Sequence, residues 1–357
     1  MGELIYIVST LIALVIAVAL IKTGHLHGRH TFDHTKGVQK FHDSQTSRIG
    51  GVAIFLAVLI SSLVLFRDNH ILYLATFSSI PVFLAGLIED TTKSVRALIR
   101  LLFAIISGFI FVLWSGLNIT NIDMPLINII FQIPALSIII TAIALAGITN
   151  AVNIIDGYNG LASGSVIIMF AGLAMLGYRA DDQIMLSFSL LHFAATFGFF
   201  VLNFPYGRIF LGDGGAYFLG FALGANVIAL IERNPELSPW TIVLVLAYPL
   251  VETLYSMARK SVTPGHSPHL ADRIHLHHLL HRAWLKPFFI AIGRKHLANP
   301  ASGAIMWGYP LLSVICAQIG YGHNILSIIL FLTLMLVYIA SYSLTASRAL
   351  AKIRQRS

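Results

Sequence analysis

Polar side chains gather within the fifteen residues 150–164, NAVNIIDGYNGLASG, which interrupt an apolar sequence running from 133 to 176. Asn150, Asn153 and Asp156 stand three residues apart, so in a continued helix they would lie roughly on one face. Polar groups this dense between apolar segments favour a functional site, because polar side chains at membrane depth cost free energy.

Two glycines in this stretch, Gly157 and Gly160, are predicted to end the preceding helix and to let the main chain approach a ligand. An ordinary capped helix end followed by a turn explains the glycines equally well. That reading leaves Asn150 and Asn153 unexplained within the helix turn before the break.

Four acids fall at the ends of apolar segments: Glu89, Asp90, Asp156 and Asp213. Few basic residues stand directly beside them, and clustered carboxylates repel one another unless a cation joins them. Oxygen ligands without cysteine favour Mg²⁺ or Mn²⁺, and Mg²⁺ takes one or two carboxylates and leaves its other positions to water and phosphates. The alternative is that each acid caps or solvates a helix end.

Three histidines, His275, His277 and His278, follow Asp272 and Arg273. They could ligate a transition metal, but neither a cysteine nor a pair spaced four residues apart accompanies them. Partly charged imidazoles beside Arg273 would serve a diphosphate equally well. A solvated basic loop is the third interpretation.

Arg48 precedes the pair Gly50 and Gly51 in the polar stretch 41–51. These residues fit either a phosphate contact or tight packing of helices, and the sequence leaves both open.

The composition around these residues is that of an integral membrane protein. Hydrophobic residues make up 57% of the 357 residues, charged residues make up 11%, and the mean hydropathy is +0.82. The one cysteine, Cys316, excludes a disulfide framework and a thiolate metal site. The formal charge of +8 lies in short loops beside the apolar segments, which indicates membrane topology and anionic lipid or phosphate rather than nucleic acid.

Hydropathy predicts an all-α polytopic membrane protein with about eleven transmembrane helices, forming a single domain over 1–357. The predicted spans are 4–21, 51–66, 71–88, 98–115, 134–149, 161–177, 184–202, 215–231, 240–258, 301–319 and 324–344. The first is expected to be a retained helix rather than a signal peptide.

Basic residues set the predicted orientation. Twenty of the 23 lysines and arginines fall on one side of an eleven-span arrangement. That side is therefore cytoplasmic, the amino terminus faces outward and the carboxyl terminus faces inward. The polar loops expected to form the site share the cytoplasmic side: 22–50, 89–97, 150–160, 203–214 and 259–300. A transporter would instead place polar groups near the bilayer midplane.

The assembled motifs resemble the polyprenyl-phosphate N-acetylhexosamine-1-phosphate transferases, glycosyltransferase family 4, which include the MurNAc-pentapeptide translocase. The family motif N-x-x-N-x-x-D-G-x-x-G-L matches Asn150, Asn153, Asp156, Gly157, Gly160 and Leu161. The motif N-x-P followed by F-x-G-D matches Asn203, Pro205, Phe210, Gly212 and Asp213. The motif D-R-x-H-x-H-H matches Asp272, Arg273, His275, His277 and His278 and resembles the GlcNAc-type branch.

Two positions depart from the family pattern. The usual pair of aspartates is Glu89-Asp90 here, which puts a direct metal role of Glu89 in doubt. A second aspartate that contacts the uracil in relatives is Asn159 here, whose amide still offers a donor and an acceptor.

The resemblance implies that undecaprenyl phosphate attacks the β-phosphate of a UDP-N-acetylhexosamine at the cytoplasmic face of a bacterial inner membrane. It implies that Asp213 binds Mg²⁺, that Phe210 stacks on the uracil, and that Asp90 lies by the lipid phosphate. UDP-GlcNAc is the expected donor. UDP-FucNAc, UDP-QuiNAc and UDP-MurNAc-pentapeptide are alternatives, and a homodimer is left open. An anion transporter and an inactive scaffold are the rival functions.

Overall fold

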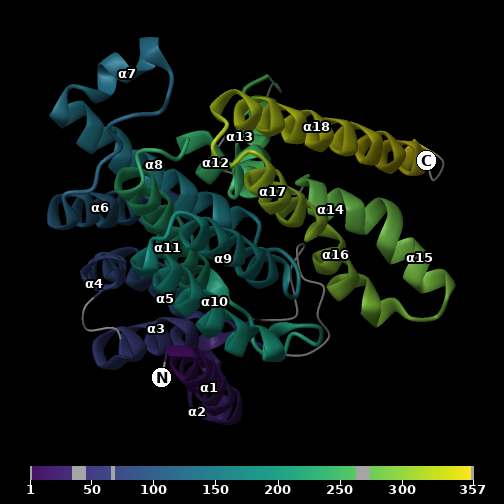
Figure 1. Ribbon diagram of the computed structural model, residues 1–357. Helices are drawn as coiled ribbons and strands as arrows, with labels where there is room; N and C mark the ends of the chain where they lie inside the picture. The colour runs from purple at the N-terminus through teal and green to yellow at the C-terminus, as the bar shows by residue number, and fades with distance from the viewer. Residues whose placement is uncertain (1, 34–45, 66–68, 263–273, 355–357) are drawn as a thin grey trace.

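The computed structural model describes residues 2–33, 46–65, 69–262 and 274–354, and there the chain is almost wholly helical (Figure 1). The elements are α1 (Gly2–Lys22), α2 (Gly24–Thr31), β1 (Phe32–Asp33), β2 (Thr46–Ser47), α3 (Gly51–Leu65), α4 (His70–Ser78), α5 (Ile80–Thr92), α6 (Ala97–Ser115), α7 (Pro125–Phe131), α8 (Pro134–Ile154), α9 (Leu161–Arg179), α10 (Gln183–Asn203), α11 (Gly212–Arg233), α12 (Pro239–Leu244), α13 (Ala247–Val262), α14 (Leu276–Leu280), the π-helix η1 (His281–Leu285), α15 (Lys286–Ala291), the 3₁₀ helix η2 (Lys295–Leu297), α16 (Ala298–Met306), α17 (Gly308–Ile319) and α18 (Asn324–Arg354). The two short strands pair antiparallel, with Phe32 opposite Ser47.

Local sequence sets many of the helix starts. Pro134 begins α8, where a missing N–H is harmless, because the first helical amides have no partner within the helix. Asn69 caps α4 by accepting from the Leu72 amide, at 3.0 Å. Such caps satisfy donors that an apolar surrounding would leave unpaired.

Within the described residues, nine helical segments are long and apolar enough to span a membrane, so the chain is a multi-pass membrane protein. They correspond to nine of the eleven predicted spans. The other two predictions meet shorter helices. The apolar part of α3 covers Gly51–Val64, and the segment 240–258 is divided between α12 and α13.

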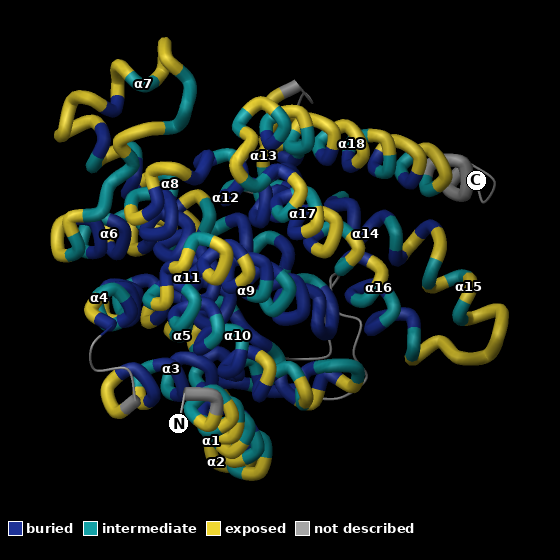
Figure 2. The backbone as a smooth tube through the Cα atoms, viewed as in Figure 1, coloured by how far each residue is buried: buried dark blue, intermediate teal, exposed yellow. Residues whose placement is uncertain are grey.

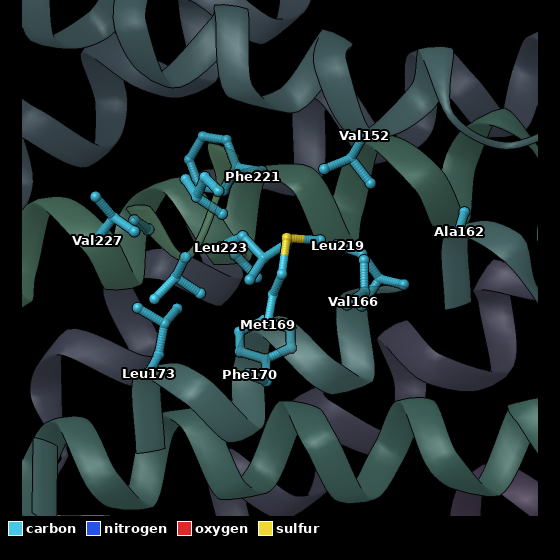
Figure 3. Packing of buried hydrophobic residues seen from close by; sticks show 14 of the residues in the cluster. Val152, Ala162, Val166, Met169, Phe170, Leu173, Leu219, Phe221, Leu223 and Val227 are labelled. Atoms are coloured by element: carbon cyan, nitrogen blue, oxygen red, sulfur yellow. The ribbon is translucent and has the colours of Figure 1, made fainter. Parts of the chain in front are cut away.

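Helix α11 forms the core of the molecule. The 18-residue apolar window of α11 is entirely buried, whereas 17% of the corresponding windows of α1 and α18 is buried. Figure 2 shows α11 enclosed by the other helices, with exposed residues on α1, α7, α15 and α18. Helices α8, α5, α3 and α9 pack directly against α11. In Figure 3, Leu219 of α11 lies beside Met169 of α9.

A polar clasp holds the end of α11 that is remote from Asp213. The Arg233 guanidinium donates to both carboxylate oxygens of Asp182, from Nε at 2.7 Å and from Nη2 at 3.0 Å. The Asn234 amide adds a third hydrogen bond to Asp182, at 3.2 Å. Because Asp182 also caps α10, this cluster ties the start of α10 to the end of α11.

Candidate active site

Glycines bring three helices into backbone contact at the start of α11. A β-carbon on Gly51 of α3 would lie 2.2 Å from Cα of Gly215, and one on Gly86 of α5 would lie 2.6 Å from the Gly214 nitrogen. Gly212 has a φ of 73°, a left-handed conformation that favours glycine. Gly51 therefore serves tight packing, one of the two roles that the sequence left open.

Asp90, near the end of α5, caps α11. Its side chain is 1% exposed and accepts from the backbone amides of Asp213, at 3.0 Å, and of Gly214, at 2.9 Å. The Arg48 Nε lies 3.6 Å from the same carboxylate. A negative charge here complements the amide donors of the helix N-terminus. Asp90 thus aligns the helix that carries Asp213.

Asp213 lies between two arginines. Arg100 of α6 forms an ion pair with one carboxylate oxygen, and the Arg48 Nη2 lies 3.7 Å from the other. The prediction that few basic residues stand beside the acids is therefore wrong. The arginines come from segments distant in sequence, and helix packing delivers them to the carboxylates.

Tyr217 links this cluster to α8. It lies one turn after Asp213, and the Arg100 guanidinium carbon is 5.8 Å from its ring centroid. The Asn153 amide donates to the Tyr217 hydroxyl at 3.3 Å. One of the predicted asparagines therefore reaches the acid cluster through a tyrosine.

Asp156 differs from the other two aspartates because its carboxylate forms no hydrogen bond or close ion pair with any residue the structure describes. Burial raises the pKa of the Asp156 carboxyl to about 7, and the Arg48 guanidinium opposes that shift. Its charge also acts on Asp90, so the three acids share one electrostatic environment. Asp156 is the carboxylate most available to a ligand.

The segment around Asp156 leaves the helix earlier than the sequence predicts. Helix α8 ends at Ile154, so Asp156 lies beyond it while Asn150 and Asn153 lie in its last turns. Gly160, with a φ of 71°, precedes α9, whereas Gly157 does not adopt a left-handed conformation. The condition under which Asp156 would share a helical face with Asn150 and Asn153, a helix that continues to Asp156, is therefore not met.

Gly157 instead provides room for the histidine motif. A β-carbon on Gly157 would lie 2.8 Å from Nε2 of His277. The neighbouring Tyr158 packs its ring against His277 and His278, and its hydroxyl lies 3.2 Å from Nδ1 of His278. The stretch 150–164 and the histidine motif therefore form one structural unit.

Burial governs the protonation of His277. It lowers the pKa of His277 well below the ordinary value, and His278 and His275 add to the shift. His277 is therefore neutral at pH 7, which corrects the expectation of a partly charged ring. Arg273 and Asp272, the other members of the motif, lie outside the described residues.

Two predicted substrate-binding asparagines form internal bonds. Asn203 accepts from the Gly160 amide at 2.8 Å and from the Ser163 hydroxyl at 3.0 Å. Asn159 donates to the Pro205 carbonyl at 3.0 Å. Both are buried and join the segment 203–207 to the start of α9.

Phe210 and Glu89 lie at the edge of the cluster. The Phe210 amide donates to the Ser47 carbonyl at 2.8 Å, and its carbonyl accepts from Gly50 at 3.0 Å, which fixes the loop carrying Arg48. Glu89 accepts from the Val95 amide at 2.8 Å and so stabilises the turn after α5. Their roles toward substrate stay predictions.

The donor set fits a weakly coordinated hard cation. No group of three or more histidine, cysteine, aspartate or glutamate side chains in the described part of the chain is arranged to hold a metal ion. Mg²⁺ needs one or two carboxylates and fills its remaining positions with water and phosphate oxygens. Two carboxylates of this region, Asp156 and Asp213, could supply such ligands, although both Asp213 oxygens face arginines.

Sequence reasoning missed three residues of this region: Arg100, Tyr217 and Glu252. Glu252 lies in α13 and its Oε1 is 2.9 Å from Nδ1 of His275. A polar residue inside an apolar helix is the one sequence signal that marks all three.

Comparison with known proteins places these motifs in a family. Residues 71–231 match the family model described as glycosyl transferase family 4. A probable undecaprenyl-phosphate N-acetylglucosaminyl 1-phosphate transferase of Bacillus subtilis (strain 168) is 29% identical over 252 residues, covering 68% of this chain and 67% of the relative. A phospho-N-acetylmuramoyl-pentapeptide-transferase of Lactobacillus gasseri is 30% identical over 230 residues, covering 60% of this chain and 70% of the relative. The chain therefore belongs to glycosyl transferase family 4.

Proposed function

We propose that this protein transfers an N-acetylhexosamine 1-phosphate from a UDP-sugar to a polyprenyl phosphate such as undecaprenyl phosphate. An oxygen of the lipid phosphate forms a bond to the β-phosphorus, and the bond from that phosphorus to the bridging oxygen breaks. UMP leaves with the bonding electrons, and the product is a polyprenyl diphosphate sugar. The names of two relatives contain undecaprenyl phosphate and the N-acetylglucosaminyl 1-phosphate group, which supports this pairing of lipid and sugar phosphate.

The observation that carries this proposal is the convergence of three aspartates and two arginines at one end of α11. Arg48 and Arg100 now contact the Asp213 carboxylate and can exchange it for phosphate oxygens. Carboxylates and phosphates both accept charge-assisted hydrogen bonds from a guanidinium. Asp90 keeps α11 aligned while this exchange takes place. The chemistry then depends on positioning and neutralisation of charge.

A divalent cation belongs to the same proposal. Asp213 and Asp156 would hold Mg²⁺, with Mn²⁺ as a substitute, and the bound ion would neutralise charge on the diphosphate. Asp156 is without a close partner among the described residues, so it can bind an ion without first losing one. Asp213 must share its oxygens with Arg48 and Arg100.

The orientation of the site follows from the distribution of basic residues. We place the acid cluster and the histidine motif at the cytoplasmic face of a bacterial inner membrane, with the amino terminus outside and the carboxyl terminus inside. Single cysteines introduced near 95 and near 235, in a Cys316→Ser background, should label from opposite sides of sealed vesicles. Labelling from the same side would refute this arrangement.

UDP-GlcNAc is the proposed donor. Purified protein supplied with polyprenyl phosphate, Mg²⁺ and a panel of labelled UDP-sugars should release UMP and form a lipid-linked product from UDP-GlcNAc. Product from UDP-FucNAc, UDP-QuiNAc or UDP-MurNAc-pentapeptide alone would change the substrate but keep the reaction. Asp156→Asn is the matched inactive control. If the native protein releases no more UMP than this variant with any of the donors, the transferase assignment is refuted.

A further inference from the structure

A buried carboxylate lies behind the histidine motif and outside the acid cluster. Glu252, in the middle of α13, is 1% exposed. Burying a charged group is costly unless hydrogen bonds or an opposite charge compensate. The residues around Glu252 should therefore show what its charge does.

Glu252 contacts the first histidine of the motif and the residue that follows it. Its Oε1 lies 2.9 Å from Nδ1 of His275 and accepts a longer bond, at 3.4 Å, from the Leu276 amide. His275 also stacks nearly parallel to His277, with ring centroids 5.5 Å apart. One carboxylate oxygen thus fixes both a ring and the backbone at the point where α14 begins.

Aromatic residues from three helices surround this pair. Tyr248 of α13, Tyr309 of α17 and Tyr338 of α18 are all close enough to interact electrostatically with Glu252. The ring centroids of Tyr248 and Tyr309 lie 5.6 Å apart, and those of Tyr309 and Tyr338 lie 5.9 Å apart. These tyrosines enclose the carboxylate in a largely aromatic surrounding.

A further tyrosine reaches the motif. The Tyr342 hydroxyl donates to the Ile274 carbonyl at 2.9 Å. Ile274 and Leu276, on either side of His275, are therefore both tied to the bundle. A helix cap would need only the bond to the Leu276 amide. The additional contacts also fix the direction of the His275 imidazole ring.

We propose that Glu252 is a positioning residue that accepts a hydrogen bond from the Nδ1–H of His275 and balances the charge of a doubly protonated ring, whose Nε2–H then donates to the diphosphate of the nucleotide sugar. A carboxylate partner on one ring nitrogen fixes how the ring is turned and supplies the opposite charge beside it. The inference rests on the proposed transferase function and names the substrate that the histidine motif serves.

The test compares Glu252→Gln with the native protein in steady-state assays that vary each substrate separately. Glutamine keeps the shape and an acceptor oxygen but removes the charge, so the ring is held less firmly. The KM for the UDP-sugar should rise about tenfold, while the KM for polyprenyl phosphate stays unchanged. Glu232→Gln is the matched control, because Glu232 bonds to Thr120 at the other end of α11.

A double variant separates positioning from a general structural role. If Glu252 acts through His275, Glu252→Gln added to His275→Ala should cause no further loss of activity. The inference would be overturned if the losses of the two single variants multiplied in the double variant. It would also be overturned if both KM values rose equally, or if the KM for the UDP-sugar did not change. In each case the transferase assignment would stand. A native protein without turnover would overturn both.

Discussion

Replacing Asp90 by asparagine tests whether this residue is a structural cap as well as a member of the site. The carboxylate accepts from two backbone amides, at 3.0 Å and 2.9 Å, and is 1% exposed. An asparagine keeps one acceptor oxygen but turns an amide N–H₂ toward the other backbone donor. One buried donor therefore loses its partner, and the Arg48 guanidinium loses a counter-charge.

The expected cost follows from these lost contacts. A hydrogen bond to a charged acceptor contributes roughly 1.5–3 kcal/mol, and the contact with Arg48 adds less because that side chain is 28% exposed and 3.6 Å away. We therefore expect Asp90→Asn to lose about 2 kcal/mol of stability together with activity. A residue acting only as a catalytic base would lose activity alone.

Thermal unfolding in detergent, followed by tryptophan fluorescence and size-exclusion, measures this difference. Asp156→Asn is the matched control, because its carboxylate makes no hydrogen bond among the described residues, and it should lose activity without losing stability at pH 7. Equal melting temperatures for Asp90→Asn and the native protein would refute the capping role. The interpretation of α11 as a helix aligned by Asp90 would then fail as well.

The raised pKa of Asp156 means that the folded protein holds a proton that the unfolded chain releases, so stability should fall as pH rises from about 4 to about 7. Asp156→Asn should flatten the plot of unfolding free energy against pH. Mg²⁺ should move the pH at which the native protein loses this stability to a lower value. An unchanged slope in the variant would contradict the assignment. Gly157→Ala should reduce turnover at least tenfold with normal expression, because the new methyl group displaces the histidine motif, whereas Gly147→Ala, where nothing lies within 4 Å, should be silent in the same assay. Arg233→Gln should lower the melting temperature by breaking its pair with Asp182 while kcat stays near native, and a selective loss of kcat would argue against a purely structural clasp.

The sequence predicted much of the fold because apolar length is a direct signal for a membrane helix. Each of the eleven predicted spans falls on helical segments, and the differences arise where a helix breaks, as between α12 and α13. Helix α8 continues five residues beyond the predicted span 134–149 and ends at Ile154. The N-x-x-N-x-x-D spacing reads as a continuous helix, but the chain turns before Asp156.

The candidate site was predicted less completely, because its charge balance depends on contacts between distant segments. Arg48 and Arg100 meet Asp213 through the packing of the 46–50 loop and α6 against α11. Glu252 reaches His275 from another helix. The spacing of residues within one segment does not reveal contacts between distant segments. Motifs did identify Gly157 and His277 as site residues, but they did not show that the two lie against each other.

The enclosure of α11 makes its length a determinant of activity. Asp213 is tied to arginines at one end, and Arg233 is tied to Asp182 at the other. Adding one residue between them would rotate one end against the other by about 100° and shift it by about 1.5 Å. Because buried neighbours and close glycine contacts prevent the helix from sliding, one end would have to release its partners. An insertion three turns from Asp213, touching no substrate, should therefore impair transfer as severely as the loss of a side chain in the site.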